Sequence, residues 1–131
     1  METMETHGGE RRGVLVPVLL LLLAERRGHG YELMERLRDF GCAGTEPAHV
    51  YRLLRTLEAA GSVTSHWRAS DSGPARREYR LTGQGARELT HSFARLGALH
   101  MTLHLFLERC DQLGVTEPAG SEQPAPGRPP V

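Results

Sequence analysis

The stretch from Thr45 to Leu81 constrains the fold of this 131-residue chain more than any other. It opens with a predicted helix in which Thr45 is a candidate N-cap, Pro47 suits the first turn and Gly61 is a stop signal. The inward face of this helix repeats at helical spacing and comprises Val50, Leu53, Leu54 and Leu57. The outward face is mostly polar and comprises His49, Tyr51, Arg52, Arg55, Thr56 and Ala59. Two β-like segments, 62–69 and 76–81, follow with a Ser/Gly/Pro loop between them.

Two further helices are predicted before this stretch. An apolar run predicts a first helix over 16–26, and Pro17 is tolerated near its start. A turn at 28–30 leads into a second helix over 31–40, joined by a short glycine-containing connection to the helix after Thr45. The expected core stripe of the second helix is Tyr31, Met34, Leu37 and Phe40. Together with the basic hairpin, this pattern predicts a winged helix-turn-helix.

A long last helix is predicted from Gly83 to Leu113, with Thr82 as its cap. At 1.5 Å per residue it would be about 45 Å long, more than a small winged core can bury. The Leu19–Leu23 run of the first helix is also apolar all round. Both features predict a homodimer, and the residues expected at its interface are Leu19, Leu22, Phe93, Leu96, Leu99, Leu103, Phe106 and Leu107.

The predicted fold class is therefore mainly α, with a two-stranded wing and a long C-terminal dimerisation helix. The expected organisation is a disordered arm over 1–13, a winged helix-turn-helix DNA-binding domain over 14–82, a dimerisation helix over 83–113 and a disordered Pro/Gly-rich tail over 114–131.

The net charge of the chain does not indicate a nucleic-acid-binding protein, but the distribution of its charges does. The formal net charge is zero and the pI is about 7.1. Between His49 and Arg80, however, six arginines face only Glu58, Asp71 and Glu78, and a local positive potential steers nucleic acid. All basic residues are arginines, which suit phosphates and guanine edges, but codon bias is the better explanation of this usage.

The sequence also predicts a cytoplasmic location and no membrane association. The apolar run from Val14 to Ala24 is too short to span a bilayer. Glu25-Arg26-Arg27 follows it directly, without the small residues of a signal-peptide cleavage site. Cys42 and Cys110 lie far apart, and we expect both to be reduced.

The candidate DNA-binding residues come from the helix and the hairpin. They are His49, Tyr51, Arg52, Arg55, Thr56, Ser72, Gly73, Arg76 and Arg77. His49 and Arg52 lie where base contact is reasonable, whereas Arg76 and Arg77 would meet phosphate or the minor groove; a solvated surface is the alternative for all four. Tyr51 either donates to phosphate or packs locally. Trp67 is expected in the core of the wing.

Other chemistry is not expected. His100 and His104 are spaced as a zinc-binding pair is, and two copies across a dimer could supply four ligands. Glu108, one turn on, is the only other candidate ligand nearby, so both histidines are better interpreted as ordinary interface residues. The sequence contains no nucleophile elbow, phosphate loop or paired-carboxylate motif, so an enzyme, a cofactor and a metal site are not predicted.

Several short motifs resemble those of the PadR-like transcriptional regulators. They are Leu22-Leu23-Ala24-Glu25, His29-Gly30-Tyr31-Glu32-Leu33, Val50 to Glu58, Gly61-Ser62-Val63 and Tyr79-Arg80-Leu81-Thr82. The resemblance covers residues 14–113, and the single helix after the wing is similar to the small subfamily.

The resemblance implies a homodimer, usually a repressor, that binds a palindromic operator and is often relieved by a small-molecule effector. It implies that Val50–Leu57 is the recognition helix and that Asp71–Arg77 is the wing tip. Arg52 stands where the family usually has proline, and Ala48-His49 replaces Gly-Thr or Gly-Ser. Base preference therefore cannot be taken from relatives. The alternative prediction is a winged-helix protein-interaction module that does not bind DNA.

Overall fold

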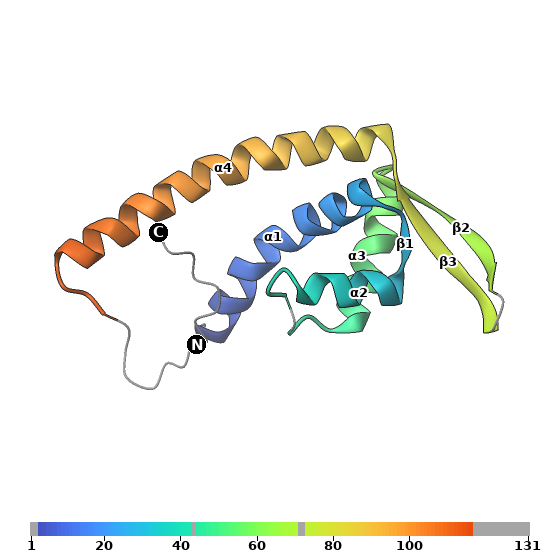
Figure 1. Cartoon of the computed structure of the whole chain (residues 1–131), viewed down its shortest axis with the longest axis horizontal. Coiled ribbons are helices and arrows are strands. Elements are labelled where there is room, and N and C mark those ends of the chain that lie inside the picture. Colours follow the sequence, from blue (N-terminus) through green and yellow to red (C-terminus); the bar gives the residue numbers. More distant parts are fainter. Residues whose placement is uncertain (1–2, 43, 71–72, 117–131) are drawn as a thin grey trace. The chain divides into compact units, whose positions relative to one another are not determined.

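The computed structural model describes residues 3–42, 44–70 and 73–116, with side chains described from Gly13 onward. The chain divides into two compact units, residues 1–95 and 96–131. The elements are α1 (Thr3–Glu25), β1 (Gly28–His29), α2 (Gly30–Arg38), α3 (Pro47–Ala59), β2 (Val63–Ser70), β3 (Gly73–Leu81) and α4 (Gly83–Gln112) (Figure 1). This mainly helical fold with an antiparallel sheet confirms the predicted fold class.

Helix α1 differs from the prediction in two respects, namely where it begins and what its leucines pack against. It begins at Thr3, so the segment expected to be a disordered arm is helical from there on; helix extension is easy once one turn exists. Its leucines supply much of the core of the first unit. Leu19 and Leu22, expected at a dimer interface, are instead buried within the single chain and have no surface left for a partner.

Helix α2 confirms half of its predicted stripe. Leu37 is buried and Met34 packs against the core, as predicted, whereas Tyr31 and Phe40 are exposed and Leu33 is buried instead. A repeat of three drifts steadily around a helix of 3.6 residues per turn, so the residues that share one face are those spaced by four. The correction matters because it places the Tyr31 ring on the surface.

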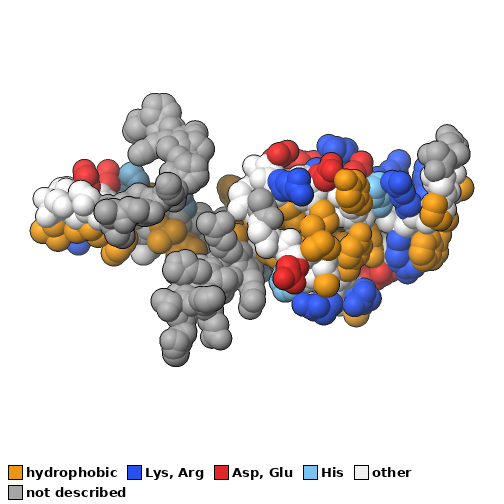
Figure 2. Space-filling view, turned by 90° about the horizontal axis from the view of Figure 1, so that it is seen from below, with side chains coloured by type: hydrophobic (Ala, Val, Ile, Leu, Met, Phe, Trp, Pro, Cys, Tyr) orange, Lys and Arg blue, Asp and Glu red, His pale blue; other side chains and the backbone are white. Residues whose placement is uncertain are grey.

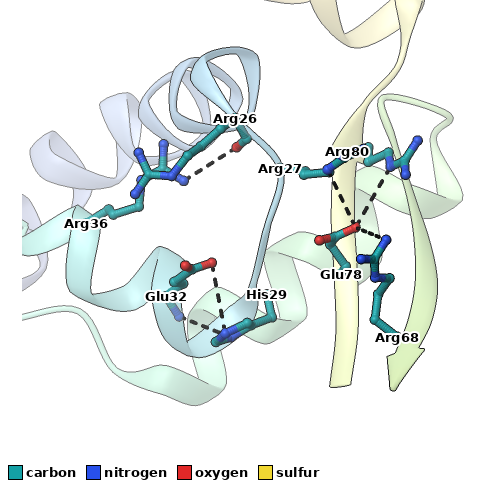
Figure 3. Close-up of polar contacts among 8 residues, drawn as sticks. All are labelled: Arg26, Arg27, His29, Glu32, Arg36, Arg68, Glu78 and Arg80. Carbon is teal, nitrogen blue, oxygen red and sulfur yellow. Dashed lines mark hydrogen bonds and ion pairs between the residues drawn. The ribbon is translucent and has the colours of Figure 1, made fainter. Parts of the chain in front are cut away.

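Arg36 of α2 ties the helix-turn-helix to the end of α1. Its Nη2 donates to the Leu22 carbonyl at 2.7 Å, and its Nη1 lies 3.5 Å from the Arg26 carbonyl (Figure 3). The side chain is only 11% exposed. The Leu22 carbonyl also accepts from the Arg26 N–H, so the guanidinium adds a second hydrogen bond to it and bridges α2 to the end of α1.

We expect Arg36→Met to lower the free energy of unfolding by about 1–3 kcal/mol, since it removes a charged hydrogen bond to a partly buried carbonyl. Urea unfolding measures the change. Arg38→Met, on the exposed side of the same helix, is the matched control and should change stability little. Equal effects of the two substitutions would contradict the role of Arg36 as a bridge between α2 and the end of α1.

The N-cap of helix α3 lies one residue later than predicted. The N-cap is Glu46, not Thr45, and no side chain caps the helix. The reason is Pro47, which occupies the first helical position and forces an extended backbone on the residue before it; Glu46 has φ −77° and ψ 142°. The predicted inward face is confirmed, because Val50, Leu54 and Leu57 are buried and Leu53 packs against the core.

The sheet holds the wing, and its order is β1-β3-β2. Strands β2 and β3 pair from Val63↔Leu81 to Ser70↔Gly73, with a register irregularity between Arg68 and Ser70. The short strand β1 lies where the sequence predicted only a turn, and Gly28 pairs with Tyr79. The wing is therefore anchored to the residues that lead into α2.

Helix α4 is fastened at its start to the end of α3. The Thr82 hydroxyl accepts from the Gly85 N–H at 3.0 Å, which confirms the predicted cap, and lies 2.7 Å from the Gly61 carbonyl. Gln84 Nε2 donates to the Ala60 carbonyl at 2.8 Å, and Ser62 Oγ donates to Glu88 Oε1 at 2.8 Å. These hydrogen bonds join the end of α3 to the start of α4.

The second unit contains the rest of α4. Hydrophobic side chains gather along one edge of this part of the helix (Figure 2). Several large apolar residues of 96–113 are exposed, namely Leu99, Met101, Leu103, Leu105, Phe106, Leu107 and Leu113. The predicted tail over 114–131 lies mostly outside the described residues.

Candidate nucleic-acid interface

The outward face of α3 presents uncommitted polar side chains. Arg52, Arg55 and Thr56 are exposed, and His49 is half-buried. Thr56 Oγ1 donates to the Arg52 carbonyl at 3.0 Å. No described side chain forms a hydrogen bond or an ion pair with the guanidinium of Arg52 or Arg55. Both guanidinium groups therefore keep all their donors available to an external acceptor.

Tyr51 joins α3 to the start of α2. Its ring lies directly against the Gly30 backbone, where any added Cβ would overlap Tyr51 Cε1. Gly30 is buried at the first position of α2. Of the two roles considered for Tyr51, local packing is therefore observed, although the residue as a whole is 38% exposed.

Contacts between side chains hold the wing to α3. Ser65 Oγ of β2 donates to Glu58 Oε2 of α3 at 2.7 Å and accepts from Arg77 Nε of β3 at 2.8 Å. The Arg77 guanidinium carbon lies 5.2 Å from the centroid of the Trp67 ring. Arg77, predicted to contact DNA, is therefore fixed in place by internal partners.

Trp67 does not lie in the core of the wing, as the alternation predicted. It is 65% exposed, although it shares a face of β2 with the buried Val63. Burial falls along β2 because the helices cover only the base of the hairpin, where Val63 pairs with Leu81. The alternation of apolar and polar residues along β2 correctly predicts which side chains share a face of the strand. It does not predict how far the hydrophobic core extends along that face.

Arg76 reaches from the wing to the helix-turn-helix. Its Nη1 lies 3.1 Å from His29 Nε2. His29 is the N-cap of α2, and its Nδ1 accepts from the Glu32 N–H at 3.4 Å (Figure 3). Of the other predicted wing residues, Gly73 is exposed at the start of β3, and Ser72 lies outside the described residues.

The other face of the sheet carries a mixed charge cluster. Glu78 Oε1 lies 3.9 Å from Arg27 Nε, 3.9 Å from Arg68 Nη1 and 4.0 Å from Arg80 Nε (Figure 3). One carboxylate thus offsets part of the charge of three guanidinium groups. The local positive charge inferred from the sequence is real, and Arg27 adds to it.

An open groove of about 450 Å³ separates the start of α2, the side of α3 and the wing. Its aromatic lining consists of Tyr31, Tyr51, Trp67 and Tyr79. A hydrogen bond to Glu35, together with the charge of that carboxylate, raises the pKa of Tyr31, and burial raises the pKa of Tyr79. Both hydroxyls are therefore protonated donors at neutral pH.

The comparisons with known proteins agree with this geometry. The model of the transcriptional regulator PadR-like family matches residues 19–91, more than half of the chain. The chain belongs to the PadR-like family. Its fold and family are those of DNA-binding transcriptional regulators.

Solved structures of PadR-like proteins resemble this one. The PadR family transcriptional regulator from Eggerthella lenta is 33% identical with a TM-score of 0.69, over 80% of this chain and 91% of that one. The PadR-like transcriptional regulator from Bacillus cereus is 26% identical with a TM-score of 0.67, over 73% and 93% respectively. None of the curated proteins matches the sequence.

The remaining features of this PadR-like chain add no second site. His104 Nε2 lies 3.2 Å from Glu108 Oε2, and the described residues hold no group of three or more side chains able to bind a metal ion. In the part of the chain that is described, no helix is long and apolar enough to cross a membrane.

Sequence reasoning missed Tyr31 and His29 as parts of the candidate interface in this PadR-like chain. The sequence places Tyr31 in the core stripe of α2, whereas the structure exposes it; His29 is the N-cap of α2 and accepts from the Glu32 N–H. The signal that pointed to them was the His29-Gly30-Tyr31-Glu32 motif itself, which was used to identify the family but not to build the site.

Proposed function

We propose that this chain is a cytoplasmic, homodimeric repressor that binds a pseudo-palindromic operator. Residues 14–82 would bind DNA and residues 83–113 would form the dimer. The observation that carries this proposal is the outward face of α3. There the guanidinium groups of Arg52 and Arg55 have no hydrogen-bond or ion-pair partner among the described residues, while the wing is joined to the same helix through Glu58 and Ser65.

In the proposed complex each α3 enters a major groove, and the two half-sites lie about one helical turn, roughly 34 Å, apart. The wing contacts the flanking backbone. The residues proposed to contact DNA are His49, Tyr51, Arg52, Arg55, Thr56, Ser72, Gly73, Arg76 and Arg77. The first five lie on α3, and Gly73, Arg76 and Arg77 lie on β3; Ser72 lies outside the described residues.

Exposed apolar side chains support the dimer. Phe93 is 79% exposed, and Leu99, Leu103, Phe106 and Leu107 are also exposed on α4. A row of large apolar side chains on a helix is stable in water only if a partner covers it. The proposed dimer surface consists of these five residues and Leu96, without the buried Leu19 and Leu22.

A mobility-shift assay with DNA from upstream of its own gene tests the proposal. We expect a shift whose affinity falls steeply with salt, because arginines that bind phosphates release counterions. If no DNA sequence gives a salt-sensitive shift, the proposal is overturned. That result would favour the alternative, a winged-helix module that binds a protein.

Arg52→Ala should weaken binding to the operator about 10- to 100-fold and weaken binding to random duplex much less, because a base contact is worth about 1–3 kcal/mol. Fluorescence anisotropy on both duplexes measures the two losses. Arg95→Ala, which removes an equal charge from the exposed surface of α4, is the control. Equal losses on both duplexes would mean that Arg52 contacts only phosphate.

A further inference from the structure

The outer part of the wing receives little support from the hydrophobic core. The exposed fraction rises along β2 from 2% at Val63 to 65% at Trp67, although the two side chains share a face of the strand. The remaining strand of the sheet, β1, pairs with β3 only at Tyr79 and Glu78. Beyond these residues the wing is a two-stranded hairpin, which is marginally stable without further contacts. Polar contacts near the base of the hairpin therefore decide its direction.

Glu58 supplies such a contact from α3. Its Oε2 accepts from Ser65 Oγ at 2.7 Å, and Ser65 Oγ in turn accepts from Arg77 Nε at 2.8 Å. Ser65 lies on β2 and Arg77 on β3, so one carboxylate is joined to both strands of the wing. All three residues are half-buried, and a charge-assisted hydrogen bond is stronger there than on the open surface. The contact between Arg76 and His29 is a separate link, which joins the wing to the start of α2.

A carboxylate is an unexpected group on this helix. Glu58 is the only acidic residue of α3, and on charge alone a carboxylate repels phosphate and lowers the affinity for DNA. Glu58 lies about two helical turns after Tyr51, so it is on the side of α3 that carries Tyr51. That side faces the wing, as the bond to Ser65 shows. The unfavourable charge therefore calls for a role in which the carboxylate acts on the wing.

We propose that Glu58 is a positioning residue for DNA recognition, which acts through Ser65 and Arg77 without contacting DNA. Its hydrogen bond fixes the angle between α3 and the wing, so that both elements meet one duplex already in place. A wing without this bond would have to be ordered when the complex forms, and that loss of entropy weakens binding. This inference rests on the proposed function and adds a residue that is not among its proposed DNA contacts.

Removing the carboxylate separates positioning from charge, because the two effects have opposite signs. Anisotropy is measured with the full-length protein on a labelled duplex from upstream of its own gene and on a random duplex of equal length. Glu58→Ala should weaken binding to the upstream duplex about 10-fold, as expected for the loss of a hydrogen bond to a charged group. Charge alone predicts the reverse, namely tighter binding to both duplexes.

The conservative substitution is the rescue experiment. Glu58→Gln removes the charge but keeps a carbonyl oxygen that can accept from the Ser65 hydroxyl. It should therefore bind the upstream duplex at least as tightly as the unmodified protein does. Glu46→Ala is the matched control, because it removes an equal charge from the exposed start of the same helix, where no side chain caps the backbone. This control should not weaken binding.

Ser65→Ala breaks the same chain of contacts from the side of the wing. It should also weaken binding to the upstream duplex about 10-fold. The double substitution of Glu58 and Ser65 by alanine should bind no more weakly than either single variant, because residues that act as one unit are not additive. Thermal unfolding of each variant shows that it is folded. If Glu58→Ala does not fold, Ser65→Ala decides the question alone.

The outcomes separate this inference from the proposed function. If Glu58→Ala binds as tightly as the unmodified protein or more tightly, the inference is overturned while the regulator proposal stands. The same holds if Glu58→Gln is as weak as Glu58→Ala, or if the losses in the double variant are additive. If the unmodified protein binds no duplex, both are overturned. Weaker binding by Glu58→Ala and Ser65→Ala, with rescue by Glu58→Gln, supports the inference.

Discussion

Gly85→Ala is expected to destabilise the first unit by about 1–3 kcal/mol, because a Cβ at this position has no room. It would overlap the Ser62 carbonyl oxygen and lie 2.6 Å from Leu81 Cδ1. The first of these atoms is backbone, so relief requires that α4 or the turn after α3 moves. Thermal unfolding measures the effect, at about 4–8 °C of Tm for each kcal/mol in a domain of this size.

Gly97→Ala, on the same helix, is the matched control, because a Cβ at Gly97 would meet no atom within 4 Å. This substitution should leave stability unchanged or raise it by about 0.5–1 kcal/mol, as alanine is the better helix former. The two substitutions thus have opposite expected signs. A Tm for Gly85→Ala equal to or above that of the unmodified protein would show that the joint between α3 and α4 is looser than its contacts indicate.

Leu103→Glu is expected to separate the proposed dimer and to reduce operator affinity about 100-fold or more. The substitution places a charge in the apolar row that a second α4 would cover, and burying an unpaired charge is strongly unfavourable. Loss of the second half-site then removes the gain of bivalent binding, which reaches about 10²–10⁴. Light scattering at micromolar concentration and anisotropy on the operator measure the two effects.

Leu105→Glu provides the comparison that makes this result specific. Leu103 and Leu105 have similar exposure, 49% and 53%, on the same helix. Each residue turns an α-helix by about 100°, so two side chains that are two positions apart, such as these, lie on nearly opposite faces. Leu105→Glu should therefore remain dimeric and bind the operator. A dimeric Leu103→Glu protein, or a monomeric unmodified protein, would contradict the proposed interface.

The secondary structure was largely predictable because its signals are local. Pro47, Gly61 and the spacing of Val50, Leu54 and Leu57 define α3, and Thr82 caps α4 as predicted. The motifs that indicated the family also have a physical basis. Gly30 and Tyr51, one from each motif, are in direct contact, so the His-Gly-Tyr-Glu turn and the tyrosine of the recognition helix form one packing unit.

The errors arose where a pattern had to be extended into three dimensions. Leu19 and Leu22 were predicted at a dimer interface because the run is apolar all round, but the core of one chain buries them. Trp67 was placed in the core because it alternates with polar residues, but the helices do not cover that end of the wing. In each case the sequence indicated that a side chain is apolar, and the packing decided what covers it.

The candidate site shows the same division. From the sequence alone came the recognition helix, the basic hairpin and the local excess of arginine, because helix propensity, strand alternation and charge depend on neighbouring residues. Only the tertiary structure showed that Arg77 is held by Ser65 and Trp67, that Arg76 faces His29, and that four distant aromatic residues line one groove. These contacts join residues from separate elements, and their distances depend on how the elements pack, which no local pattern encodes.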